Sequence, residues 1–172
     1  MKPLLVPLLM ALSVAHLSRA EPLKLHPENP HYFLYEGKPE VIITSGEHYG
    51  ALLNLDFDFA PYFEELEAHG LNNTRVFSGA YVEPQGAFNI ARNTLAPAEN
   101  RFIAPWARSD APGYAHGGNK FDLTKWNPDY FQRLHEFMAE ADKHGVIVEM
   151  VLFCPFYGEE QWKLSPQNAA NN

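Results

Sequence analysis

The sequence has little of what disulfide-rich, metal-binding and nucleotide-binding proteins need. Its 172 residues include one cysteine, Cys154, so no disulfide can form within the chain. The eight histidines are scattered without an HxH, HExxH or CxxC spacing, so the pattern indicates no metal site. Neither GxGxxG nor GxxxxGK(S/T) follows a strand-like run, which leaves a nucleotide-binding fold without support. We therefore expect neither a metal nor a dissociable cofactor, and we interpret Cys154 as a small buried residue.

Long hydrophobic runs are absent beyond the first 20 residues. There, an early lysine precedes an apolar run over residues 3–15, and Ser18 and Ala20 fit a small-x-small cleavage pattern. The run is shorter than the ~20 apolar residues that a membrane span needs, although an anchor is the alternative interpretation. The pattern predicts an export signal at 1–20 and one mature domain at 21–172, secreted or periplasmic and free of the membrane once the signal is removed.

Positive charge is also scarce. Removing Lys2 and Arg19 with the signal leaves 11 basic residues against 21 acidic ones, a net charge of −10. This balance argues against nucleic acid or an anionic membrane as the main partner. Aromatic residues, in contrast, make up 13% of the chain, and its three tryptophans lie in the second half. Such richness indicates a surface that stacks on the flat apolar faces of a ligand.

Strand-like and helix-like segments alternate along the first half. Residues 32–35 and 41–44 read as strands joined by the turn EGKPE, and the second of them as a strand buried on both faces. A helix is expected between the cap Asp58 and Gly70, with one apolar face. A strand follows at 74–77. The expected apolar face of the helix consists of Phe59, Tyr62, Phe63 and Leu66.

The second half contains one long irregular stretch and one further helix and strand. Residues 78–126 show no convincing period and are expected to be a long functional loop. Asn127 and Pro128 predict the start of a helix, and a continuously apolar strand is expected over residues 146–153. The expected buried face of this helix consists of Phe131, Leu134, Met138 and Ala141.

This order predicts an α/β fold with right-handed parallel crossovers. A doubly wound sheet is one solution. A (β/α)8 TIM barrel explains the large elaboration after the second strand better, because barrel active sites lie on loops that follow strands. The mature chain of 152 residues supplies three strands, whereas a barrel typically needs ~250 residues. We therefore expect the first part of a truncated barrel, insoluble or molten when expressed alone.

Three segments resemble the N-terminal portion of a cellulase-like glycoside hydrolase of clan A: NPHYFLYEGKPEVIITSGEHYG, TRVFSGAYVEPQGAFN and FDLTKWNPDYFQRLHEFMAEADKHGVIVEMVLFCPF. The resemblance covers nearly all of the mature chain. It implies a secreted retaining glycosidase that acts on a poly- or oligosaccharide. In that family the two catalytic glutamates lie at the ends of strands four and seven, so the resemblance implies that neither is present in this chain. Glu47, Glu83 and Glu149 are not assigned to those roles.

The resemblance gives Arg75 a role on the second strand. It implies that this arginine supports the nucleophilic carboxylate through charge-assisted hydrogen bonds. The alternative is a structural ion pair, for example with Glu149 on the neighbouring strand. Both can hold, because one guanidinium carries five donors.

Further candidates are expected on the loops that follow the strands. Their types suit sugar hydroxyls and sugar rings, although each has ordinary loop packing as its alternative. The same loop region contains polar residues that the sequence does not rank, namely Glu83, Asn89 and Arg92. The candidate substrate-binding residues are His48, Tyr81, Gln85, Trp106 and Phe156.

Three functions stay open at this point. The first is the N-terminal part of an exported glycoside hydrolase with a carbohydrate substrate. The second is a non-catalytic carbohydrate-binding or degenerate barrel protein. The third is a barrel hydrolase that uses a metal.

Overall fold

The computed structural model describes residues 23–44 and 48–172. The predicted export signal and Glu47 lie outside the described residues. The chain divides into two compact units, with a boundary between Val41 and Ile42, and each is described here by itself.

The first unit contains a small antiparallel sheet in the order β1-β2-β3. Its central and third strands form a hairpin in which Phe33 lies opposite Glu40. Glu36 and Gly37 make the turn with positive φ angles of 47° and 75°, as the turn residues of the sequence predict. The strands are β1 (Lys24–Leu25), β2 (Phe33–Tyr35) and β3 (Lys38–Glu40).

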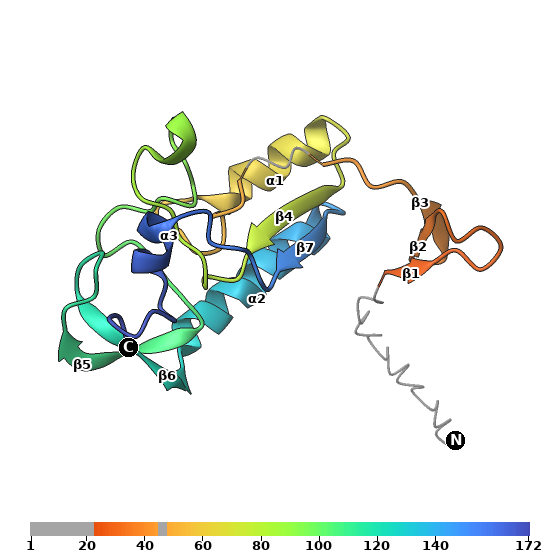
Figure 1. Ribbon diagram of the computed structural model, residues 1–172. Helices are drawn as coiled ribbons and strands as arrows, with labels where there is room; N and C mark the ends of the chain where they lie inside the picture. Colours follow the sequence, from red (N-terminus) through yellow and green to blue (C-terminus); the bar gives the residue numbers. More distant parts are fainter. Residues whose placement is uncertain (1–22, 45–47) are drawn as a thin grey trace, which may run out of the picture. The chain divides into compact units, whose positions relative to one another are not determined.

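The second unit is built on two parallel strands, β4 and β7, which lie side by side in Figure 1. In their register Arg75 lies opposite Glu149. The predicted strand at 41–44 is reduced to a parallel bridge between Thr44 and Asn73. The elements of this layer are α1 (Phe59–Ala68), β4 (Asn73–Phe77), α2 (Pro128–Lys143) and β7 (Ile147–Val151).

The expectation that residues 41–44 are buried on both faces is wrong. Val41 is 59% exposed and Ile43 is 50% exposed. The backbone of Ile43 hydrogen-bonds with Asn72, whose side chain accepts from the Ile43 amide at 2.7 Å. The contacts on this edge hold the backbone of the segment without covering its side chains.

Both predicted helices begin where the sequence predicts, and α1 ends before the predicted Gly70. The carboxylate of Asp58 accepts from the amide of Ala60 at 3.2 Å, and the Asn127 side chain caps α2 through the amide of Asp129 at 3.1 Å. Gly70, with φ of 66°, follows α1, where a side chain would strain the left-handed backbone.

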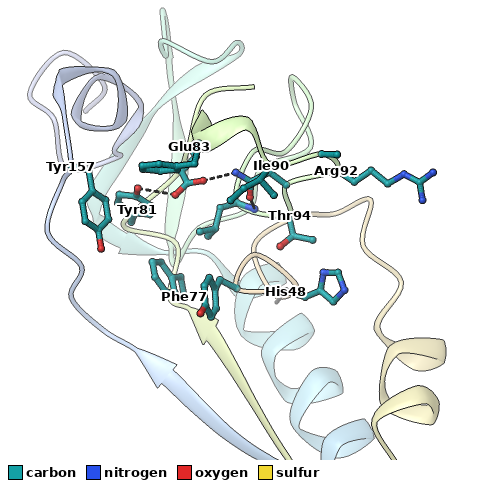
Figure 2. Close-up of a pocket in the computed structure, with 13 residues that line it drawn as sticks. His48, Phe77, Tyr81, Glu83, Ile90, Arg92, Thr94 and Tyr157 are labelled. Carbon is teal, nitrogen blue, oxygen red and sulfur yellow. Dashed lines mark hydrogen bonds between the residues drawn. The ribbon is translucent and has the colours of Figure 1, made fainter. Parts of the chain in front are cut away.

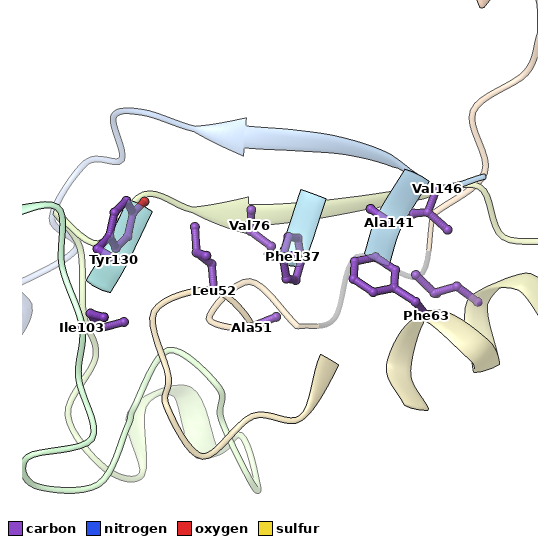
Figure 3. Packing of buried hydrophobic residues seen from close by; sticks show 10 residues of the cluster. Ala51, Leu52, Phe63, Val76, Ile103, Tyr130, Phe137, Ala141 and Val146 are labelled. Atoms are coloured by element: carbon purple, nitrogen blue, oxygen red, sulfur yellow. The ribbon is translucent and has the colours of Figure 1, made fainter. Parts of the chain in front are cut away.

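The main core lies between these helices and β4, as Figure 3 shows. Phe63 of α1 and Phe137 of α2 meet with ring centroids 4.9 Å apart, and Val76 packs into the same cluster. The predicted buried face of α2 is partly wrong, because Phe131 and Met138 are 42% and 44% exposed. The helix buries Ala141, as predicted, together with Tyr130 and Phe137.

The expectation of one long loop over residues 78–126 is also wrong. A short 3-10 helix and an antiparallel hairpin, β5 with β6, lie in this region. Register shifts interrupt the hairpin, which disrupts the alternating pattern that would reveal it in the sequence. A second hydrophobic cluster, containing Phe102, Tyr114 and Phe121, packs beneath it. These elements, with the last helix, are η1 (Ala87–Asn89), β5 (Trp106–Pro112), β6 (Asn119–Trp126) and α3 (Glu159–Leu164).

The architecture is therefore mixed α/β with small sheets. The described residues contain a parallel strand pair, with α1 before it and α2 between its strands, and they form no closed barrel. Within the same residues, no helix is long and apolar enough to cross a membrane.

Candidate functional site

A cleft of about 610 Å³ opens in the second unit at the end of β4. Figure 2 shows side chains from separate stretches of the chain converging on it. His48 and Phe77 lie on one side, a loop over residues 81–95 forms much of the wall, and Tyr157 enters from the segment after β7. The complete lining consists of His48, Tyr49, Phe77, Tyr81, Glu83, Phe88, Ile90, Ala91, Arg92, Asn93, Thr94, Leu95 and Tyr157.

A buried carboxylate, that of Glu83, lies in the wall of the cleft. Glu83 is 5% exposed. The hydroxyl of Tyr81 donates to Oε1 at 2.9 Å, and the amide of Asn93 donates to Oε2. The backbone N–H of Glu83 donates to the carbonyl of Leu95 at 2.8 Å. These contacts fix the orientation of the carboxylate and leave it lone pairs for a ligand donor.

The surroundings of Glu83 keep the phenol of Tyr81 and the thiol of Cys154 protonated. Burial and the hydrogen bond to Glu83 raise the pKa of Tyr81 well above its ordinary range, so its phenol remains a donor. Burial and the charge of Glu83 likewise raise the pKa of the Cys154 thiol. Cys154 is half-buried and its thiol is therefore a weak nucleophile at neutral pH, in accord with a packing role.

Aromatic rings form part of the rim of the cleft. Phe88 and Tyr157 are 56% and 67% exposed, and their rings meet edge to face with centroids 5.8 Å apart. Phe88, Asn89 and Arg92 have φ angles of 54°, 57° and 54°, a backbone conformation that residues other than glycine rarely adopt. Such backbone strain is typical of functional loops that the surrounding structure holds in place.

Two of the five residues predicted to bind substrate line this cleft, namely His48 and Tyr81. The amide of Gln85 instead donates to the carbonyls of Ala96 and Pro97 and lines a neighbouring hollow.

Trp106 and Phe156 lie outside the cleft as well. Trp106 is half-buried at the start of β5 and packs against the second hydrophobic cluster. Phe156 packs between Tyr81 and Trp162, with ring centroids at 5.8 Å and 5.0 Å. A substrate contact for any of the five residues stays a prediction.

Arg75 forms the ion pair that was the alternative to a catalytic role. Its guanidinium lies 2.9 Å and 3.0 Å from the two carboxylate oxygens of Glu149. Hydrogen bonding to Glu149 raises the pKa of Arg75, so the guanidinium stays charged. Both side chains are about half exposed, and neither lines the cleft. The supporting role of Arg75 in catalysis therefore stays a prediction.

Phe88 and Tyr157 were not among the predicted binding residues, and Glu83 was not ranked above its polar neighbours. An acid inside the apolar run AYVEP is a signal that could have distinguished Glu83 from its neighbours. Phe88 and Tyr157 carry no such signal, because loops far apart in the sequence bring them together. No group of three His, Cys, Asp or Glu side chains with metal-binding geometry occurs in the part of the chain that the structure describes.

No family model matches the chain, and no curated protein matches it at a significant level. Among solved structures, the chain is similar to a protein from Bacteroides vulgatus ATCC 8482 provisionally described as a glycoside hydrolase, with a TM-score of 0.52 and 15% identity. The similarity covers 80% of this chain and 25% of that protein, so this chain spans about a quarter of its length. At this identity the similarity concerns the fold. The chain thus shares the fold of one part of a protein provisionally described as a glycoside hydrolase.

Proposed function

We propose that the chain is the N-terminal part of a secreted or periplasmic glycoside hydrolase with a (β/α)8 barrel, and that it supplies one wall of the sugar cleft. The parallel pair of β4 and β7, with α2 between them in the chain, supports this proposal, as does the shared fold with part of the Bacteroides protein. In a barrel, substrates bind on the loops beyond the carboxyl ends of the strands. The cleft at the end of β4 lies in that position.

The observation that carries the proposal is the combination of a buried carboxylate and exposed aromatic rings in one cleft. Sugar rings present apolar C–H faces that pack on rings such as Phe88 and Tyr157. Sugar hydroxyls donate strong hydrogen bonds to a carboxylate such as that of Glu83, which Tyr81 and Asn93 hold in place.

The proposed hydrolysis follows a retaining mechanism with two carboxylates, ~5–5.5 Å apart. One protonates the leaving oxygen while the other attacks the anomeric carbon. Among the described residues Glu83 is the one acid that lines the cleft, and we assign it to sugar hydroxyls rather than to either catalytic role. In this proposal the catalytic pair is supplied by a longer protein. Arg75 then donates to the nucleophile with N–H groups that Glu149 does not use.

A non-catalytic carbohydrate-binding protein is the second candidate. The lining of the cleft favours it, because one acid and not a pair lines the cleft in the described part of the chain. A single carboxylate can bind hydroxyls, but it cannot complete the retaining mechanism.

Binding and hydrolysis of a glycan panel by the full-length protein test both candidates. Phe88→Ala and Tyr157→Ala are expected to weaken glycan binding about tenfold each, because they remove the apolar platform. Phe131→Ala, which changes an exposed ring outside the cleft, is the matched control. Binding without hydrolysis would favour the second candidate, and the absence of any glycan binding would refute both.

The role of Arg75 has its own test in the full-length enzyme. Arg75→Ala should lower kcat, whereas Glu149→Gln, which removes the charge of the visible partner, should lower it far less. Equal losses would make the ion pair a structural feature and would contradict the supporting role.

A further inference from the structure

Arg92 differs from every other arginine in the described part of the chain. Arg75 pairs with Glu149, and Arg101 pairs with Asp56 at 2.6 Å. The other two are also engaged: Arg108 lies over aromatic rings and donates to a backbone carbonyl, and Arg133 donates to four carbonyls. Arg92 is exposed, and its guanidinium makes no hydrogen bond or ion pair with a described residue.

Arg92, which pairs with no described residue, lies at the candidate site. Arg92 lines the main cleft and also a second hollow of about 290 Å³. Figure 2 shows it on the opposite side of the cleft from Tyr157, with its guanidinium directed outward, away from Glu83. The left-handed φ of 54° costs backbone energy, so this loop conformation is held by its surroundings.

The charges around Arg92 leave room for an anion. The second hollow contains one acid, Asp56, whose carboxylate is already bonded to Arg101. The main cleft contains Glu83, whose two oxygens accept from Tyr81 and Asn93. Among the described residues, neither of these two acids pairs with Arg92.

We propose that Arg92 binds the anionic group of an acidic glycan, either the carboxylate of a uronic acid or a sulfate ester. This inference rests on the proposed carbohydrate function. The planar guanidinium donates two parallel N–H bonds to a carboxylate or sulfate, which a neutral sugar cannot accept in the same way. The remaining sugar hydroxyls then face Glu83, and a sugar ring packs near Tyr157. The cleft thus selects a glycan with a negative charge displaced from the aromatic rim.

Calorimetric titration of the full-length protein with three oligosaccharides of equal length tests the inference. One is an oligogalacturonide, one a sulfated galactan oligomer and one a neutral cello-oligosaccharide. At least one acidic glycan should bind about tenfold or more tighter than the neutral one, and the preferred anion identifies carboxylate or sulfate as the source. Because salt screens the attraction between charges, the affinity for that acidic glycan should also fall as the salt concentration rises from about 0.05 to about 0.5 M.

Substitutions locate the effect. Arg92→Gln should remove the preference for the acidic glycan while leaving the neutral glycan unchanged, and Arg92→Lys should retain part of it. Lys125→Gln removes one exposed charge outside both hollows and should change nothing. Equal affinity for neutral and acidic glycans in the wild-type protein would overturn the inference and leave the proposed function standing. Binding of none of the three would overturn both.

Discussion

At the scale of single residues, Glu83 shows how a charged group can be kept inside a folded loop. Its carboxylate is almost fully buried, and each oxygen has a donor, Tyr81 for one and Asn93 for the other. A buried carboxylate without such donors would carry a large desolvation cost. The two donors therefore belong to the stability of the loop as well as to the geometry of the cleft.

Replacing Tyr81 by phenylalanine should measure this contribution. Tyr81→Phe keeps the ring and removes the donor to Glu83, and we expect a loss of about 1.5–3 kcal/mol in the free energy of unfolding, as for hydrogen bonds to charged groups. Urea unfolding measures it. Tyr32→Phe, at a 47% exposed tyrosine, is the control and should change stability by less than about 0.5 kcal/mol. Equal values for the two variants would show that the Glu83 carboxylate does not depend on this donor.

At the scale of secondary-structure elements, one side chain of α2 holds the segment that precedes α1. Arg133 is half-buried, and its guanidinium lies 5.0 Å from the ring of Phe59. Its planar fork can reach several carbonyls at once, which a lysine cannot do. It donates to the carbonyls of Ala51, Leu52, Asn54 and Phe57 at distances of 2.8–3.0 Å.

Arg133→Lys should therefore destabilise the second unit although it conserves charge. We expect a loss of about 1.5–3 kcal/mol in urea unfolding, because several buried carbonyls lose their donor. The matched variant is Arg101→Lys, in which an exposed pair with Asp56 is altered, and its effect should lie within about 1 kcal/mol. A harmless Arg133→Lys would mean that water replaces the guanidinium at these carbonyls.

The contact between the ends of α1 and α2 should make stability depend on pH. His144 lies 2.6 Å from Glu67 and 3.0 Å from Glu140, and its side chain is 8% exposed. The hydrogen bond to Glu67 raises the pKa of His144, while burial and nearby Lys143 oppose the shift. Because the folded pKa lies above the unfolded one, the stabilisation is fully present below about pH 6.5 and is lost as pH rises through the folded pKa.

We expect wild type and His144→Gln to differ most in the free energy of unfolding near pH 6 and to converge at alkaline pH. The unfolding measurements start at about pH 5.5. Glu140 has a lowered pKa, so its own contribution to stability is lost only as pH falls much further. His135→Gln, at an exposed histidine of the same helix, should give no such trend. A difference that is independent of pH would exclude the charged histidine as its cause.

At the scale of the whole molecule, one face of the parallel sheet and the segment after it remain open. Val76 points into the helical core, so its neighbours Arg75 and Phe77 point to the other face. Beyond the end of β7, Leu152 and Phe153 are 61% and 88% exposed. A two-stranded sheet is only marginally stable by itself, and large exposed apolar residues are typical of surfaces that associate.

The chain of residues 21–172 by itself should therefore associate in solution. Light scattering coupled to size exclusion should give a mass above the monomer at micromolar concentrations, and Phe153→Ser should shift it toward the monomer. Leu25→Ser, at an exposed residue of the first unit, controls for the loss of any apolar side chain. A monodisperse monomer with a sharp melting transition would contradict this expectation.

The sequence by itself determined the local structure that depends on neighbouring residues. The caps at Asp58 and Asn127, the glycine after α1 and the parallel pairing of β4 with β7 all follow from short-range patterns and chain connectivity. Only the tertiary structure decided which residues are covered. It shifted the buried face of α2 to Tyr130 and Phe137, because 3.6-residue periodicity allows more than one stripe until a partner surface is in place.

The candidate cleft was likewise decided by tertiary structure. Residue types predicted an aromatic, polar surface on the loops, and His48 and Tyr81 do lie in the cleft. The pairing of Glu83 with Asn93 depends on how one loop folds back on itself, and that of Phe88 with Tyr157 on two segments far apart in the chain. Hydrophobic periodicity carries no information about such contacts, because the cores beneath the loops set the loop positions and the sequence pattern of the loops does not.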